Sequence, residues 1–111
     1  MVNKIKKAQK FLTSAGYKHI ADCDAELAVE ILIQFSTHGI RPDQFWRSSD
    51  YPDCWVARYG RFVPDKNLNE WIVNEVGKAI NEIGYKVEMV GANLAHNEHE
   101  QYFELVFKVN K

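Results

Sequence analysis

The chain has 111 residues, of which 46% are hydrophobic, 13% aromatic and 26% charged, and its formal net charge is -1. A chain of this size and composition can bury one hydrophobic core without disulfide or metal support, which excludes intrinsic disorder and leaves no room for a second core. The small net charge also disfavours a protein that coats nucleic acid or an anionic membrane by bulk electrostatics.

Two amphipathic helices are predicted in the first third of the chain. Over residues 3–15, apolar residues recur at three- and four-residue spacings between lysines, which predicts a helix with a lysine-rich outer face. Residues 22–38 carry a wider apolar stripe, with Asp22 or Asp24 to cap the start and Gly39 to end the helix. Because apolar residues cover more of its surface, we expect the second helix to be central.

An irregular connection and a strand are predicted next. Residues 40–53 contain two prolines, two adjacent serines and three aspartates, which predicts a long irregular loop. Residues 54–63 are rich in aromatic and branched side chains, which predicts a strand. The alternation of side chains along a strand places one set on each face of the sheet. The two sets are Trp55, Ala57 and Tyr59, and Cys54, Val56 and Arg58.

A third helix is predicted from Asn67, where Asn67 and Glu70 have the spacing of a capping box, to a stop at Gly84. Gly77 lies inside this helix and costs about 1 kcal/mol relative to alanine, which close approach of a neighbouring element would explain. The expected buried face consists of Leu68, Trp71, Ile72, Val76, Ala79, Ile80 and Ile83.

Two alternating segments, residues 85–89 and 102–109, predict a hairpin with one buried face and a loop near residues 92–100. The element order is therefore α-α-β-α-β-β. We expect a single α+β domain over residues 1–111, with a small three- or four-stranded, mainly antiparallel sheet and helices packed on one face. The last strand is expected to lie antiparallel beside one or both of the other strands, after a right-handed crossover.

The arginines are unevenly distributed along the chain. All four lie in residues 41–62, which we call the Arg/aromatic segment; it contains no lysine and holds six of the 14 aromatic residues. Arginine binds carboxylate and phosphate groups through planar contacts, and aromatic rings provide stacking surfaces. The candidate binding residues are Arg41, Trp46, Arg47, Tyr51, Arg58 and Arg61.

Two interpretations of this segment remain open. In the first, Trp55 and Tyr59 belong to the core and the arginines pair with Asp43, Asp50 and Asp53. In the second, the segment forms a binding surface. Tryptophan, tyrosine and arginine are enriched at the energetic centres of protein interfaces, so we rank a protein partner above nucleic acid.

Metal binding and catalysis have little support in the sequence. Residues 96–100 read His-Asn-Glu-His-Glu, and His96 and His99 are weak candidates for holding a zinc-like ion. A single pair of histidines outside a helical frame is more typical of a polar hairpin loop. No glycine-rich phosphate loop and no nucleophile motif is found. We therefore expect no cofactor and lean against an enzyme.

The compartment is inferred from what the sequence lacks. No apolar run follows the N-terminal lysines, and no segment approaches the roughly 20 apolar residues of a membrane helix. Cys23 and Cys54 are accordingly expected to be reduced thiols. We expect a cytoplasmic protein without membrane contact.

Our leading hypothesis is a small interaction protein that binds a protein partner, or a second copy of itself, through the Arg/aromatic segment. Small chains with an exposed strand edge readily pair through it, and a two-fold homodimer is the commonest assembly. The alternative is a small-molecule or nucleotide-binding domain, possibly an enzyme, with the arginines as anion clamps and Trp46 or Tyr51 as a stacking platform.

A third possibility is nucleic-acid binding through residues 1–18, which carry five lysines and no acid. The next 22 residues carry four acids and no lysine or arginine, which disfavours it.

Overall fold

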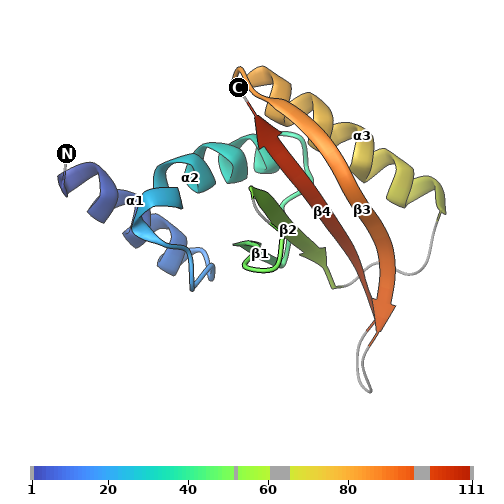
Figure 1. Ribbon diagram of the computed structural model, residues 1–111, viewed down its shortest axis with the longest axis horizontal. Helices are drawn as coiled ribbons and strands as arrows, with labels where there is room; N and C mark the ends of the chain where they lie inside the picture. Colours follow the sequence, from blue (N-terminus) through green and yellow to red (C-terminus); the bar gives the residue numbers. More distant parts are fainter. Residues whose placement is uncertain (1, 52, 61–65, 97–100, 111) are drawn as a thin grey trace.

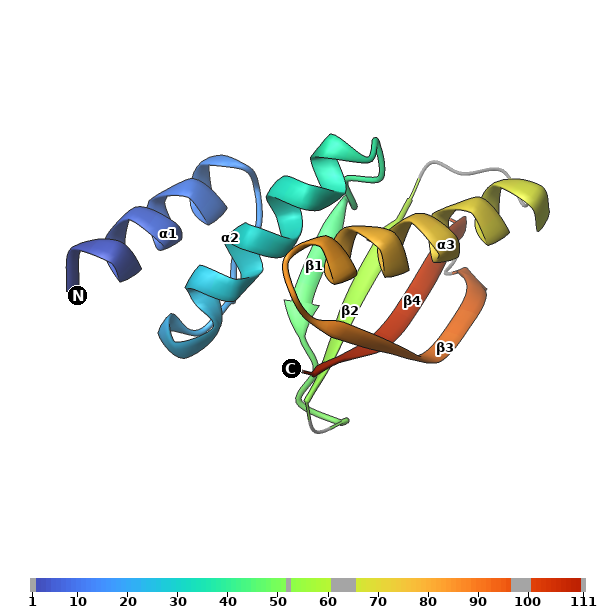
Figure 2. The same ribbon diagram turned by 90° about the horizontal axis from the view of Figure 1, so that it is seen from above.

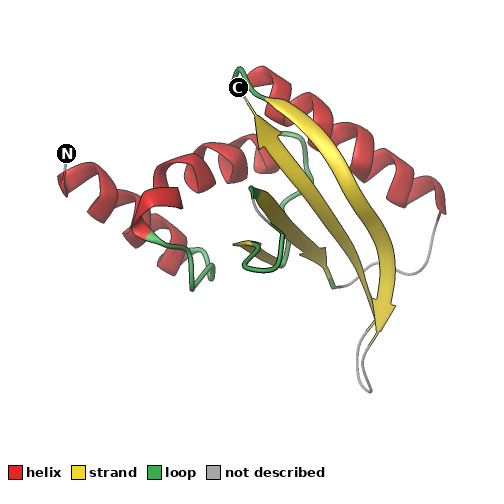
Figure 3. Ribbon diagram, viewed as in Figure 1, coloured by secondary structure: helices red, strands yellow, loops and turns green. Residues whose placement is uncertain are grey.

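The computed structural model describes residues 2–51, 53–60, 66–96 and 101–110, which form three helices and one four-stranded sheet (Figures 1 and 3). The strand order is β1-β2-β4-β3, and every neighbouring pair is antiparallel. The expected α+β class is confirmed, and the last strand does lie antiparallel beside two others. The elements are α1 (Val2–Ser14), α2 (Asp22–Thr37), β1 (Gln44–Arg47), β2 (Cys54–Tyr59), α3 (Lys66–Glu82), β3 (Lys86–His96) and β4 (Gln101–Asn110).

The strands differ from the sequence prediction in three places. The strand predicted over residues 54–63 ends at Tyr59, and residues 61–63 lie outside the described part of the chain. The segment expected to be an irregular loop contains β1, which pairs with β2 because Phe45 and its neighbours alternate between the buried core and the other face. The loop expected near residues 92–100 is shorter, because β3 continues to His96 and pairs with β4 on both sides of a bulge. A β-bulge between Met89 and Gly91 bends β3 near its middle.

Glycines end the helices as predicted, but α2 begins without the expected aspartate cap. Gly16, Gly39 and Gly84 have φ angles of 92°, 73° and 87°, a backbone region that side chains disfavour. The cap residue of α2 is Ala21, which offers no side-chain hydrogen bond. Asp22 lies inside the helix and accepts a hydrogen bond from Gln9 Nε2 of α1 at 3.0 Å instead, so its carboxylate joins two helices.

One face of the sheet carries the core. Trp55, Ala57 and Tyr59 of β2 are buried there, as their alternation predicted, together with Phe45 of β1. An aromatic cluster joins this face to α2, since the Phe35 ring lies 6.0 Å from that of Phe45, which itself stacks on Trp55 at 5.0 Å. Ile72 and Val76 of α3 belong to the same core, so α2 and α3 pack on the same face of the sheet.

The helix α1 packs against α2 at one end of the molecule, while α3 lies along β3 and β4 (Figure 2). This arrangement leaves parts of the predicted apolar stripes uncovered. Trp71, which was expected to be buried, is exposed on α3, and Phe11 and Ile33 are exposed on α1 and α2. None of the described helices combines the length and apolar character needed to cross a membrane.

A histidine at the end of α2 joins that helix to α3. Nδ1 of His38 lies 2.8 Å from Glu75 Oε2, and its Nε2 lies 3.0 Å from Glu82 Oε2. Hydrogen bonds to Glu82 and Glu75 raise the pKa of His38, and the bond from His38 lowers the pKa of Glu75. Only the protonated ring can donate to both carboxylates, so this junction depends on protonation.

Candidate functional site

The most organised polar group on the sheet surface is Arg58, on the face of β2 opposite the core. Its guanidinium carbon lies 4.8 Å from the ring centre of Trp46 and 4.5 Å from that of Tyr102. Nε donates to Glu104 Oε2 at 2.6 Å, and Nη1 donates to Gln44 Oε1 at 3.4 Å. The two neighbouring strands therefore hold this arginine in place, while about a third of its side chain stays exposed to solvent.

A groove of about 460 Å³ opens beside this arginine, between the segment that follows α1 and the strand β1. We call it the β1 groove. It is lined by Gly16, Tyr17, Lys18, His19, Gln44, Phe45, Trp46 and Arg58. Lys18 is exposed and has no ion-pair partner among the described residues, so the groove combines two cationic side chains with an aromatic ring.

Tyr17 and Arg41 fix the wall of the β1 groove. The hydroxyl of Tyr17 donates to the carbonyl of Pro42 and accepts from Arg41 Nε at 3.0 Å, and Arg41 Nη2 donates to the carbonyl of Ala15 at 2.7 Å. Burial raises the pKa of Tyr17, against the opposing effect of Arg41, so the hydroxyl remains a donor. These bonds tie the segment after α1 to the chain that enters β1.

The backbone of β1 offers unpaired groups to the same groove. Ser48 N donates to the Cys54 carbonyl at 2.9 Å, and Asp43 N donates to the Arg58 carbonyl at 2.8 Å. The register continues from Ser48 and Cys54 through the pairs Trp46–Val56 and Gln44–Arg58, so the alternation turns the N–H and C=O groups of Phe45 and Arg47 toward the open edge. The β1 groove thus contains a free strand edge.

The remaining predicted site residues lie elsewhere. Arg47 binds Asp24 Oδ1 of α2 at 3.2 Å and Asp53 Oδ1 at 3.0 Å, and it lies over the Trp55 ring. Tyr51 is exposed in the turn between β1 and β2 and does not line the β1 groove. Arg61 lies outside the described residues.

Of the three aspartates expected to pair with arginines, Asp53 does so and Asp43 has another partner. Arg47 pairs with Asp53 as expected. Asp43 instead accepts a hydrogen bond from the backbone N–H of Gly60 at 2.5 Å, because its carboxylate lies beside the end of β2. Arg58 pairs with Glu104 of β4, an acid outside the Arg/aromatic segment.

Sequence reasoning missed Tyr102, Glu104, Gln44 and Lys18. Tyr102 and Glu104 come from β4, more than 40 residues after Arg58, and only the pairing of β2 with β4 brings them beside it. The alternation over residues 102–109 did place both on the polar face of their strand, which was the available signal.

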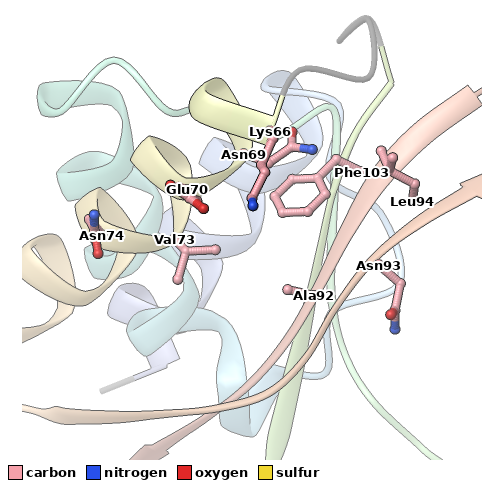
Figure 4. A pocket seen from close by; sticks show the side chains of 9 residues that line it. All are labelled: Lys66, Asn69, Glu70, Val73, Asn74, Ala92, Asn93, Leu94 and Phe103. Carbon is pink, nitrogen blue, oxygen red and sulfur yellow. The ribbon is translucent and has the colours of Figure 1, made fainter.

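A second groove, of about 690 Å³, lies between α3 and the end of β3 (Figure 4). We call it the α3/β3 groove. Its apolar lining is formed by Val73, Ala92, Leu94 and Phe103, and Lys66 and Glu70 are at its rim. The figure shows Val73 facing Ala92 across the groove, with the ring of Phe103 beside them.

No group of three metal-binding side chains occurs in the part of the chain that the structure describes. The side chain of His96 and the whole of His99, the two weak metal candidates, lie outside that part. Comparisons with known protein families, with curated proteins and with solved structures found no match for this chain.

Proposed function

We propose that this protein is a cytoplasmic interaction domain that binds an extended, acidic segment of a partner protein in the β1 groove. The observation that carries the proposal is the coincidence, in one groove, of a free strand edge with the cationic side chains Lys18 and Arg58. Cys23 and Cys54 are both unpaired thiols, which fits a reducing compartment.

The free edge of β1 supplies the first half of the recognition. An extended peptide that pairs with Phe45 and Arg47 gains main-chain hydrogen bonds and adds a fifth strand to the sheet. Strand addition of this kind gives affinity with little dependence on sequence. Selectivity therefore has to come from the side chains around the edge.

The side chains of the β1 groove favour acidic residues in the bound segment. Alternate side chains of an added strand point to the face that carries Trp46 and Arg58. Glu104 bonds only the Nε donor of Arg58, which leaves Nη2 free to donate among the described residues, and Lys18 has no ion-pair partner there. Glutamate or aspartate in the segment forms charge-assisted hydrogen bonds with these groups, each worth roughly 1.5–3 kcal/mol.

A small anionic molecule is the second candidate, because the volume of the β1 groove lies within the range of ligand pockets. The position of Arg58 over the Trp46 ring argues against a stacked base, since the guanidinium already occupies that surface. Tyr51, the other expected stacking platform, does not line the groove.

A labelled peptide of alternating glutamate and valine tests the proposal by fluorescence anisotropy, with the lysine–valine peptide as control. We expect Arg58→Gln combined with Glu104→Gln, which keeps the pair hydrogen-bonded but uncharged, to weaken binding about tenfold, or roughly 1.4 kcal/mol. Tyr51→Ala is the matched control, because it removes an exposed aromatic ring outside the groove, and it should leave binding unchanged.

Equal binding of the acidic and basic peptides would contradict the proposal. NMR amide shifts locate the bound peptide, and we expect them to change at Phe45 and Arg47. Saturable binding of ATP at the same amides, without peptide binding, would favour the small-molecule function instead. Shifts confined to the lysines of α1, with affinity falling steeply as salt is added, would favour nucleic-acid binding by that helix.

A further inference from the structure

The second edge of the sheet, β3, is protected over only part of its length. Its first half carries the charged residues Lys86 and Glu88 and ends at the bulge between Met89 and Gly91. Charges and bulges are the usual means by which proteins prevent edge strands from pairing with other chains. From Ala92 to Leu94, the strand has no charge and no bulge.

Hydrogen bonding across the sheet shows which groups this unprotected half presents. The carbonyls of Cys54 and Arg58 face β1, so the intervening residues of β2 bond to β4. In β4, the residues that bond to β2 alternate with those that bond to β3, and Glu104 is one of the latter. Asn93 lies opposite Glu104 and therefore bonds to β4. The N–H and C=O groups of Ala92 and Leu94 therefore point away from the sheet, toward the open edge.

The side chain of Leu94 projects beside a groove that it does not fill. It is 52% exposed, whereas Phe103, opposite it on β4, is buried. The α3/β3 groove lies next to it, with Val73 and Ala92 facing one another across the floor and Asn93 pointing away (Figure 4). This half of β3 thus presents an apolar projection and an apolar hollow side by side.

The rim of the α3/β3 groove carries one charge of each sign. Lys66 and Glu70 have no ion-pair partner among the described residues. A two-fold axis that places Lys66 of one copy beside Glu70 of the other also places Glu70 of the first beside Lys66 of the second, because the contacts of a two-fold interface occur in equivalent pairs. A strongly acidic or strongly basic partner pairs with only one of the two residues and is repelled by the other.

We infer that a second copy of this chain occupies this surface, with the two β3 strands antiparallel about a two-fold axis near Asn93. In this arrangement, Ala92 of each copy pairs with Leu94 of the other through main-chain hydrogen bonds. Each Leu94 then lies against the small Ala92 and over the α3/β3 groove of the other copy. The two sheets become one sheet of eight strands with the helices on one side.

The other edge of the sheet is less suited to self-pairing. A two-fold contact through β1 joins two copies of the groove that holds Lys18, which has no ion-pair partner among the described residues, and like charges across an interface cost free energy. The edge of β1 is also only four residues long, against 11 for β3. Self-association is therefore assigned to β3, independently of the segment proposed to bind at β1.

Sedimentation equilibrium of the full chain, at protein concentrations up to about 1 mM, tests the dimer. We expect the unmodified protein to be a dimer, and Leu94→Asp and Ala92→Pro to be monomers. The proline removes only the N–H that points to the open edge, which an edge strand tolerates. Val90→Asp is the matched control: Val90 is exposed on the same strand, but at the bulge, and its substitution should leave the dimer intact.

Amide hydrogen exchange on the unmodified protein gives a second test that does not depend on how the variants fold. The amides of Ala92 and Leu94 should be protected, although both face the open edge of a single copy. Both amides exchanging freely, a monomer at every concentration, or a dimer that survives both Leu94→Asp and Ala92→Pro would overturn the inference. So would a dimer that dissociates on substitution of Arg58.

Discussion

Arg47 fastens the sheet to the start of α2, and its removal should weaken the fold. The guanidinium binds Asp24 of α2 and Asp53 of the β1–β2 turn, and it covers the ring of Trp55 at 5.3 Å. These contacts join elements that are distant along the chain. We therefore predict that Arg47→Ala lowers the free energy of unfolding rather than acting mainly on partner binding.

The size of this loss follows from the exposure of each partner. The pair with Asp53 contributes little, about 0.2–0.5 kcal/mol, because the aspartate is 69% exposed. The pair with Asp24 contributes more, about 1 kcal/mol, because the arginine is 29% and the aspartate 20% exposed. The contact with the ring of Trp55 adds about 0.5 kcal/mol. The total is about 2 kcal/mol.

Urea unfolding followed by circular dichroism measures this loss. With an m-value of about 2 kcal/mol/M, the unfolding midpoint of Arg47→Ala should fall by about 1 M. A double-mutant cycle should give a larger coupling of Arg47 with Asp24 than with Asp53. A midpoint unchanged within about 0.2 M, or a larger coupling with Asp53, would refute the reasoning.

Two further predictions concern stability. The raised pKa of His38 means that its contribution is complete below its ordinary pKa of 6.5 and is lost as the pH rises through the folded-state pKa. The free energy of unfolding, measured with urea, should therefore be lower at about pH 8 than at about pH 6, and this difference should be smaller in His38→Gln. An equal difference in both proteins would contradict the argument. Gly77→Ala should stabilise α3 by about 0.5–1 kcal/mol, because the added Cβ meets Val87 Cγ1 at an ordinary 3.7 Å. Gly84→Ala should destabilise by about 1 kcal/mol, because alanine disfavours its φ of 87°. Thermal unfolding measures both, and shifts of the same sign would count against the argument.

Patterns repeated within one element were sufficient to predict the helices and the buried face of β2. The three helix stops coincide with glycines of positive φ, and Trp55 and Tyr59 lie in the core as their alternation indicated. Both features depend on local geometry, which neighbouring residues determine. The α+β class followed because the helical and alternating periods were distinct along the chain.

Features that depend on pairing between distant strands were not predictable. The strand β1 is short and lies among prolines and aspartates, so its local composition resembles a loop, and only pairing with β2 makes it a strand. The end of β3, from Ala92, lacks a marked alternation and is held by β4. Trp71 was assigned to the core because the apolar stripe of α3 is wider than the surface the sheet covers.

The candidate site shows the same division. Arginines close together in the sequence were expected to act together, but strand alternation separates them. Arg58 lies on the open face with Trp46, whereas Arg47 lies on the side of α2 and is used in the fold. The residues that complete the surroundings of Arg58, Tyr102 and Glu104, come from β4 and were beyond the reach of any local pattern.

The two edges of the sheet differ in charge in a way that assigns them different partners. At β1, Lys18 adds repulsion to any pairing of two copies, whereas Lys18 and Arg58 attract an acidic segment. At β3, the stretch from Ala92 to Leu94 is uncharged, and the balanced rim of the α3/β3 groove is complementary to its own copy. Since β1 and β3 lie at opposite ends of the strand order, a dimer formed through β3 leaves both β1 grooves at the outer ends of the joined sheet. Two partner segments can then bind one dimer without competing, and a partner that carries two such segments gains affinity from their linkage.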